Sequence, residues 1–249
     1  MTMIRGVRIR ATRCCGKLYA SPRYLSMNFM AFAFWTDGWR ENSLMPNESG
    51  LRQCECGAYV RLKDLIDISE EEESDLPSLS QIPGHLLHDC IERAVDKDME
   101  ILARFAYWRY ANHGYRESYK VHRDEEEEEN KQVWDAAERE NQSWWKRILR
   151  LPTPEYVRSA TSRFTVPKFE PSDIQIENMT ALSDKLLASQ LSSPRARALD
   201  LAELYRELGR FLEAKLQISK IPENETGITS NLISDLIDKK EIALIRYRM

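Results

Sequence analysis

Hydrophobic and polar positions follow a two-residue period near the start of the chain and a period of about four residues in its second part. At the start, Val7, Ile9 and Ala11 alternate with Arg8 and Arg10, which is the pattern of a β-strand with one exposed face. Arginines on such a strand are typical of a sheet edge that is protected from pairing with another sheet. We therefore expect an exposed, charged edge strand here.

A β-hairpin is predicted further along the same part of the chain. Aromatic and apolar residues spaced for a strand run up to Trp35, and Asp37-Gly38 is a favoured two-residue hairpin turn. Residues 39–45 would then return antiparallel to the first strand. The N-terminal part of the chain is accordingly predicted to be a small β module.

The rest of the chain shows helical periodicity. A first helix is expected from Gly84 to about Tyr110, because apolar residues recur there at helical spacing, and Asn112-His113-Gly114 supplies a stop. Four prolines between Pro152 and Pro171 mark a long connector. Further helical segments are expected in this order: an amphipathic stretch at 131–152, a segment at 177–189, a pair at 193–222 and a tail at 228–247.

Residues 198–218, ALDLAELYRELGRFLEAKLQI, resemble a tetratricopeptide hairpin. In that repeat, small residues allow close helix packing and a glycine, here Gly209, turns the chain. Single units need neighbours to bury their faces, so the segment at 177–191 and the C-terminal tail are the expected packing partners. An ordinary αα-hairpin explains the pattern equally well, and either hairpin would present a helical face suited to another protein.

Charge divides the chain where the periodicity changes. Residues 1–63 contain ten basic and four acidic side chains, whereas the whole chain has a net charge of −4. The change from a basic to an acidic composition falls at 64–83, DLIDISEEEESDLPSLSQIP, which has seven acidic residues and no basic one. Its serines and prolines indicate a solvated connector. A second acidic run, at 124–129, is expected to be a solvated helix start or loop.

Composition indicates a globular protein in a reducing compartment. Hydrophobic residues make up 42% of the chain and charged residues 31%, and the chain has only 9 glycines, which favours helices over a glycine-rich β architecture. The longest apolar run, at 29–35, is too short to span a bilayer. Five cysteines, an odd number, together with no recognisable export signal favour a cytoplasmic location.

Two cysteine pairs, each followed by a glycine, are the strongest chemical signal. RCCG at 13–16 and QCECG at 53–57 bracket the predicted hairpin. A zinc ribbon is assembled in this way, because four thiolates close a tetrahedron around one ion and each glycine allows a tight turn. The candidate metal ligands are therefore Cys14, Cys15, Cys54 and Cys56, with zinc as the metal.

The cysteine spacing departs from that of a regular ribbon, in which two residues separate the cysteines of each pair. Here Cys14 and Cys15 are adjacent, and one residue separates Cys54 from Cys56. Adjacent side chains of a strand point to opposite faces, so Cys14 and Cys54 would complete a site only with distorted turns. Two outcomes stay open: a zinc site, or a metal-free ribbon that keeps its cysteines as small buried hydrophobes. A redox role is less favoured, because vicinal disulfides are strained.

These patterns together predict an α+β fold, in which a small zinc-ribbon-like β module precedes a mainly α-helical body with a tetratricopeptide-like hairpin. The body is expected to begin after the acidic connector. The expected division is a β module at 1–67, an acidic linker at 68–83, a helical region at 84–151, a proline-containing connector at 152–176 and a tetratricopeptide-like helical region at 177–249.

The order of these motifs resembles an uncharacterised family of bacterial proteins. The resemblance rests on RCCG, on the aromatic hairpin that ends in FWTDGW, on SLMP and on QCECG, followed by ARFAYWRYANHGYR and LYRELGRFLEA. It covers most of the chain at the level of pattern and implies no established activity. Family members with full Cys-x-x-Cys knuckles would be expected to bind zinc, whereas both knuckles are shortened here.

Enzymatic signatures are scarce. His85 and His88 would lie on one helix face with Cys90 close by, but no third metal ligand with a meaningful spacing accompanies them. A nucleophile elbow, a phosphate-binding loop and a dinucleotide fingerprint are all lacking from the sequence. We therefore predict a protein that is not an enzyme.

Two non-enzymatic functions are considered. The first is a bacterial protein-interaction module, an adaptor or an immunity-type protein, whose acidic helical part binds a partner such as a basic toxin or effector. The second is a zinc-ribbon regulatory protein that binds nucleic acid through Arg5, Arg8, Arg10 and Arg13. The first is favoured because the whole chain is acidic, with a pI near 5.7, so nucleic acid is an unlikely partner and no membrane partner is expected.

Overall fold

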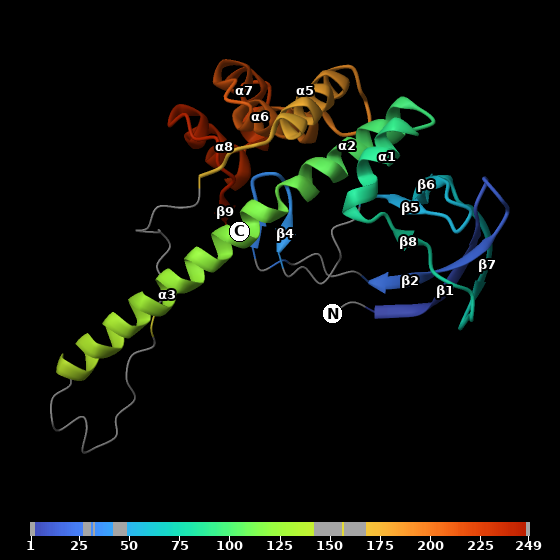
Figure 1. Ribbon diagram of the computed structural model, residues 1–249, viewed down its shortest axis with the longest axis horizontal. Helices are drawn as coiled ribbons and strands as arrows, with labels where there is room; N and C mark the ends of the chain where they lie inside the picture. The colour runs from blue at the N-terminus through green and yellow to red at the C-terminus, as the bar shows by residue number, and fades with distance from the viewer. Residues whose placement is uncertain are drawn as a thin grey trace. The chain divides into compact units, whose positions relative to one another are not determined.

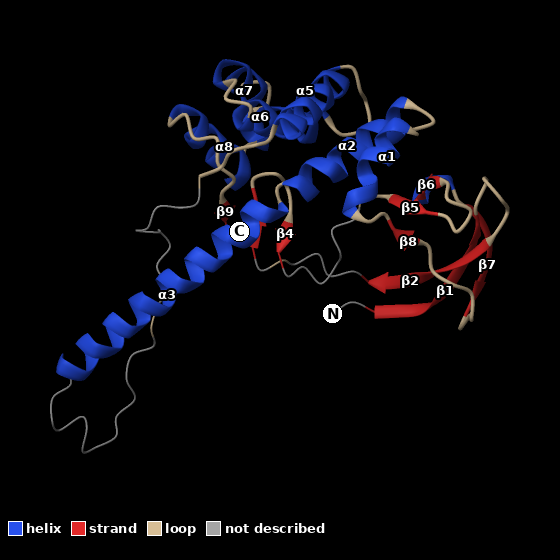
Figure 2. Cartoon of the chain, in the orientation of Figure 1, coloured by secondary structure: helices blue, strands red, loops and turns tan. Residues whose placement is uncertain are grey.

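The computed structural model describes residues 3–26, 31, 33–41, 49–141, 156 and 168–247. The chain divides into two compact units. One unit comprises residues 1–111 and 171–249 and contains three small sheets and most of the helices, and the other comprises residues 112–170 (Figures 1 and 2). The small antiparallel sheets and the helical body agree with the predicted α+β class.

The first sheet has the strand order β2-β1-β7 and is antiparallel throughout. Its strands are β1 (Met3–Ala11), β2 (Leu18–Ser26) and β7 (Ile66–Glu71). The predicted strand at the N-terminus is therefore present, but its placement at a sheet edge was wrong. β1 is the central strand, because β2 pairs with one of its edges and β7 with the other. Ile9 is buried on one face of the sheet, and the arginines on the other face pair with carboxylates of β7.

The acidic stretch at 64–83 contains two strands. β7 occupies its first part, and β8 (Ser80–Gln81) pairs with β5 (Leu51–Gln53) near its end. Acidic residues form a strand here because Asp67 and Glu70 lie beside arginines of the neighbouring strands. This stretch thus completes two sheets of the N-terminal part, and the domain boundary drawn through it stays a prediction.

The second sheet, of order β6-β5-β8, packs against two helices. Its remaining strand is β6 (Tyr59–Arg61), and the helices are α1 (Leu87–Glu92) and α2 (Lys97–Ala111). One helix was predicted from 84 to 110, but the structure breaks it between α1 and α2. Asp96 explains the break, because its carboxylate accepts a hydrogen bond of 2.8 Å from the backbone N–H of Met99 and so begins a new helix.

The third sheet, of order β4-β3-β9, joins the predicted hairpin to the C-terminus. Its strands are β3 (Ala33–Trp35), β4 (Arg40–Glu41) and β9 (Arg246–Tyr247). A turn is present at Asp37-Gly38, but its loop has three residues, 36–38, and not the predicted two, because the N–H of Trp35 donates to the carbonyl oxygen of Trp39 at 2.9 Å. Gly38 has φ +77°, and Asp37 Oδ1 accepts a hydrogen bond of 3.0 Å from the N–H of Trp39. The rest of the predicted return strand, residues 42–45, lies outside the described residues.

The C-terminal tail was predicted to be helical throughout, and this was wrong for its last residues. Helix α8 (Ile228–Asp238) ends before Lys240, which has φ +55°, and the chain then extends into β9. Arg246 of β9 forms an ion pair of 2.6 Å with Glu41 of β4, and both side chains are largely buried. Pairing with β3 therefore overrides the local helical pattern.

The helical body consists of α5 (Asp173–Leu187), α6 (Pro194–Glu207), α7 (Phe211–Ile218) and α8, with α6 packed against α5, α7 and α8. The predicted αα-hairpin is present as α6 and α7, and Gly209 turns the chain between them with φ +71°. Ala202 and Ala214 are fully buried, as close packing of these helices requires. Its membership of the tetratricopeptide class stays a prediction.

A buried arginine ties α6 to the rest of this unit. Arg206 is fully buried and paired with Glu203 one turn away. Its Nη1 donates to the carbonyl oxygen of Ala243 at 2.9 Å, and its Nη2 donates to Thr36 Oγ1 at 3.4 Å. One guanidinium thus connects α6, the β3–β4 turn and the C-terminal tail.

The second unit contains α3 (His113–Asn141). The acidic run at 124–129 lies in the middle of this helix, so its prediction as a helix start or loop was wrong. The tryptophans at 144 and 145 and most of the predicted proline connector fall outside the described residues. In the described part of the chain, no helix is long and apolar enough to cross a membrane.

Candidate metal centre

The first cysteine pair lies in the turn that joins β1 to β2. The backbone N–H of Thr12 donates to the carbonyl oxygen of Lys17 at 3.0 Å, and that of Gly16 donates to the carbonyl oxygen of Thr12 at 2.9 Å. Gly16 has φ +71°, a conformation that glycine adopts without strain. Cys14 and Cys15 therefore belong to a closed turn and not to a strand, so their side chains need not point to opposite faces.

The second pair lies in the turn that joins β5 to β6. The N–H of Cys54 donates to the carbonyl oxygen of Ala58 at 2.8 Å, and the N–H of Gly57 donates to the carbonyl oxygen of Cys54 at 2.8 Å. Gly57 has φ +84°. The turn begins at Cys54 and passes through Cys56, so both thiols lie on one short loop.

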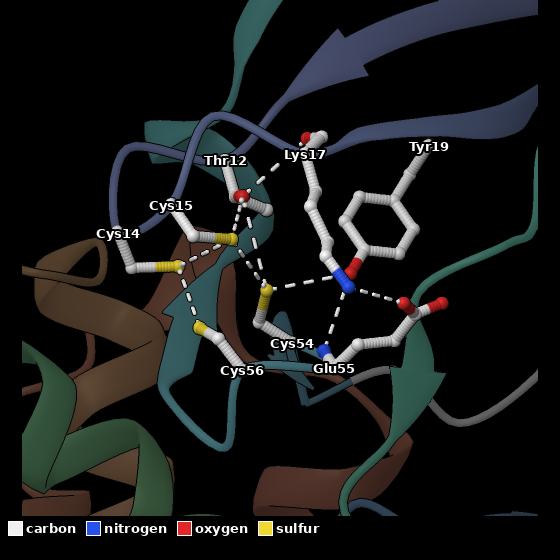
Figure 3. Close-up of polar contacts among 8 residues, drawn as sticks. All are labelled: Thr12, Cys14, Cys15, Lys17, Tyr19, Cys54, Glu55 and Cys56. Carbon is white, nitrogen blue, oxygen red and sulfur yellow. Dashed lines mark hydrogen bonds and ion pairs between the residues drawn. The ribbon is translucent and has the colours of Figure 1, made fainter.

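The two turns bring all four thiols together (Figure 3). The Sγ atoms of Cys14, Cys15, Cys54 and Cys56 all lie within 4.8 Å of one another. Cys15 Sγ is 3.5 Å from Cys54 Sγ, Cys56 Sγ is 3.5 Å from Cys14 Sγ, and the adjacent pair is separated by 3.9 Å. In a tetrahedral site with zinc–sulfur distances of about 2.3 Å, the sulfur atoms lie about 3.8 Å apart. The donor set and its spacing therefore fit one zinc ion.

The four cysteines lie close together, as predicted, but by a different route. They were expected at one end of the hairpin that turns at Asp37-Gly38. That hairpin belongs to the third sheet. The cysteines instead occupy the ends of two other hairpins, β1–β2 and β5–β6.

Two neighbouring residues that sequence reasoning missed contact the cysteines. Thr12 Oγ1 lies 3.5 Å from Cys15 Sγ and 3.8 Å from Cys54 Sγ. Tyr19 Oη lies 3.3 Å from Cys54 Sγ and accepts a hydrogen bond of 3.2 Å from the N–H of Glu55. Thr12 could have been noticed, since it stands three residues before Cys15, where a regular knuckle has its first cysteine. No sequence signal indicates Tyr19.

An ion pair closes the contact between the turns. Lys17 Nζ of the first turn lies 2.8 Å from a carboxylate oxygen of Glu55 in the second (Figure 3). Both side chains are about half exposed, so solvent screens the pair and its contribution to stability is small. The pair orients the two turns relative to one another more than it contributes to the free energy of folding.

The protonation of the thiols is uneven. Burial acts to raise the pKa of Cys54, but hydrogen bonds from Tyr19 and from the backbone N–H of Cys56 outweigh it and lower that pKa to about 6. The hydrogen bond from Thr12 lowers the pKa of Cys15. Loss of solvation raises the pKa of Cys14 to about 12. The pKa of Cys54 thus lies well below that of Cys14, and a metal ion that takes all four sulfurs as thiolates would release protons.

The histidine pair considered from the sequence does not form a comparable site. His88 is exposed and lies 3.5 Å from Glu92, whereas Cys90 is buried in the core of the second sheet. The four cysteines are the one group of three or more metal-binding side chains found together in the described ranges.

Comparisons with known protein families, with curated proteins and with solved structures find no match. Of the resemblance to an uncharacterised bacterial family, the structure supports a cluster of four cysteines and a mostly helical body. Membership of that family stays a prediction.

Proposed function

We propose that the four cysteines bind one structural zinc ion and that the protein is a non-enzymatic interaction protein whose helical part binds a partner protein. The zinc site is proposed because the four sulfur atoms lie within bridging distance of a single metal ion. Four thiolates fill a tetrahedron and leave no coordination position for water or a substrate. Zinc held in this way supports a structure and takes no part in chemistry.

A structural zinc would join a short hairpin of the second sheet to the first sheet. The strands β5 and β6 have three residues each, and an isolated two-stranded hairpin is at best marginally stable in water. Metal bound by both turns would connect this hairpin to β1 and β2. The free energy of binding would then contribute to the stability of the folded N-terminal part.

Elemental analysis of protein purified without added metal tests the zinc site. We expect about one zinc per chain, lost in the Cys15→Ser variant and kept in the Cys90→Ala variant, whose cysteine lies in the core away from the cluster. Chelation should lower the melting temperature of the wild-type protein. Zinc far below one per chain, with unchanged melting in chelator, would leave a metal-free ribbon and contradict the proposal.

The acidic surface of α3 supports a basic protein partner. Four acidic residues in its central part are exposed, and they are spaced four positions apart in two pairs, so that they share one face of the helix: Asp124 with Glu128, and Glu125 with Glu129. The negative electrostatic field of these carboxylates accelerates association with a positively charged surface. In an adaptor or an immunity-type protein, carboxylates of this kind would occupy the site where a basic toxin holds phosphate.

Co-purification with the products of the flanking genes tests this part. We expect one of these products to bind, and the Glu125→Lys/Glu129→Lys variant to weaken binding at least about tenfold by removing the favourable field. The matched control is Glu177→Lys/Asp184→Lys, which makes the same charge change on the exposed side of α5. Absence of any binding neighbour, or an equal effect of both variants, would contradict the proposed interaction.

Nucleic-acid binding by the N-terminal arginines is the alternative function. In the structure, Arg8 and Arg10 form ion pairs with Glu70 and Asp67 of β7, so the basic strand is partly neutralised by its own neighbour. A salt titration with random-sequence DNA separates the two functions. Micromolar binding that weakens steeply with salt would favour the nucleic-acid alternative.

A further inference from the structure

A cavity of about 580 Å³ lies beside the first sheet and is lined by four arginines. These are Arg8 and Arg10 of β1, Arg23 of β2 and Arg52 of β5. Among the described residues, no acidic side chain lines the cavity. A cavity of this volume is within the range of small-molecule sites.

The register of the first sheet places three of these arginines together. Arg8 is opposite Ser21, and Arg10 is opposite Tyr19. Residues opposite one another in an antiparallel pair share one face, and Arg23 is on that face because it follows Ser21 by two positions. The sheet therefore presents three guanidinium groups and a tyrosine on the same side.

Carboxylates of β7 hold these arginines in place without neutralising all of them. Glu70 pairs with Arg8 at 3.2 Å and with Arg23 at 2.8 Å, and Asp67 pairs with Arg10 at 2.8 Å. Each of these ion pairs uses one nitrogen of a guanidinium group that carries five N–H donors. Two carboxylates thus orient three arginines, which keep donors for a further anion.

The fourth arginine comes from the second sheet. Arg52 is 8% exposed, and its Nη1 donates to the carbonyl oxygen of Leu51 at 2.8 Å. Its presence in the lining adds a positive charge that comes from outside the first sheet.

Most of the remaining lining is apolar or aromatic. Leu62, Leu65 and Leu79 supply apolar surface, and Tyr24 supplies an aromatic ring. Residues near Leu79 are held against β2, because the carbonyl oxygen of Pro77 accepts a hydrogen bond of 2.9 Å from the N–H of Ala20. The cavity therefore combines a cationic part with an apolar part.

We propose that this cavity binds a phosphorylated ligand of nucleotide size, with its phosphate on the arginines and its ring against the leucines. Arginine is the residue best suited to phosphate, because its planar fork donates two parallel hydrogen bonds. An apolar wall favours a ligand that carries a flat ring in addition to its charge. The proposal does not depend on zinc, because none of the four cysteines lines the cavity.

Calorimetric titration of the full chain tests the site. The probes are the four nucleoside 5′-monophosphates, each used separately, with inorganic phosphate and a short single-stranded oligonucleotide as further arms. At least one monophosphate should bind at one site per chain with a Kd below about 1 mM, and more tightly than inorganic phosphate. No binding by any monophosphate would overturn the proposal. Tighter binding of the oligonucleotide than of every monophosphate would overturn it in favour of a nucleic-acid surface.

Matched variants distinguish binding of the monophosphate at this cavity from a general attraction of phosphate to the positive charge of the protein. Arg23→Gln should weaken binding of the monophosphate about tenfold, since it removes one charge-assisted contact. Arg5→Gln removes the same charge from β1 at an exposed position outside the lining and should change binding less than about twofold. Likewise, Ser78→Glu inside the lining should weaken binding, and Ser80→Glu outside it should not. Equal effects within either pair would overturn the proposal.

Discussion

The hydroxyl of Tyr19 lies 3.3 Å from Sγ of Cys54, and the same side chain lines the arginine cavity. Tyr19 is 2% exposed. Burial and its contact with Cys54 raise the pKa of its hydroxyl, so the phenol stays protonated at neutral pH and donates to the thiolate. One buried tyrosine thus supports the candidate metal centre from the β2 side.

Tyr19→Phe should weaken zinc binding by roughly 10- to 100-fold, because hydrogen bonds to metal ligands contribute on this scale. Competition with a chromophoric chelator measures the affinity. Tyr24→Phe is the matched control, because Tyr24 lies on the same strand and makes no recorded contact with a cysteine. Equal zinc affinity of Tyr19→Phe and the wild-type protein would show that the contact with Cys54 does not support the metal.

Gly16→Ala should lower the free energy of unfolding by about 1–2 kcal/mol, since an L-residue is strained at φ +71°. In the described part of the chain, a Cβ atom at this position would meet no atom within 4 Å apart from those of its chain neighbours, so the expected loss is conformational. Gly114→Ala is the opposite case, because Gly114 is the second residue of α3, and alanine there should stabilise the helix by at most about 0.5 kcal/mol, less than in a helix interior. Urea unfolding followed by circular dichroism measures both, and a neutral Gly16→Ala would contradict the strain argument.

Arg206→Met should destabilise the protein by about 3–5 kcal/mol, because it leaves the buried carboxylate of Glu203 without its partner. Replacing both residues, as Arg206→Met/Glu203→Leu, should recover part of this loss. Arg210→Met removes a half-exposed ion pair with Glu213 and should cost less than about 1 kcal/mol. Thermal or chemical unfolding compares the three variants, and similar losses in Arg206→Met and Arg210→Met would contradict the role given to burial.

Glu207→Gln should change how stability depends on pH. Burial, together with the nearby Glu203 and Asp37, raises the pKa of Glu207 well above its usual 4.5. As the pH rises above 4.5, the unfolded chain loses this proton before the folded chain does, so the wild-type protein loses stability that the variant keeps. The melting temperature of Glu207→Gln should therefore increasingly exceed that of the wild-type protein between pH 4.5 and pH 8.

A matched control for this pH effect is Glu213→Gln. A hydrogen bond from the backbone of Glu213 and one from Arg210 lower the pKa of the Glu213 carboxyl below its usual 4.5. The wild-type protein therefore gains stability relative to this variant as the pH rises toward 4.5. This gain is complete at about pH 4.5, so between pH 4.5 and pH 8 the difference between Glu213→Gln and the wild-type protein should stay constant, whereas that of Glu207→Gln should grow. A difference between Glu207→Gln and the wild-type protein that is independent of pH would show that Glu207 is ionised in the folded state.

Local patterns in the sequence determined the kinds of element and the turns between them. The alternation around Ile9 predicted β1, the Asp37-Gly38 pair predicted the turn between β3 and β4, and Gly209 predicted the turn between α6 and α7. Each depends on residues a few positions apart, so the chain encodes them without knowledge of the rest of the fold. The Cys-Gly turns belong to the same class, and they identified all four cysteines of the cluster.

Only the tertiary structure decided which strands pair and which charges become buried. β1 is a central strand because β7, nearly sixty residues later, brings Asp67 and Glu70 to its arginines. The tail ends as a strand because β3 lies beside it. Tyr19 and Arg206 acquire their roles from partners on other elements. Pairing between distant segments depends on the free energy of the whole packed chain, and the local period of hydrophobic residues carries no information about which distant segment will be the partner.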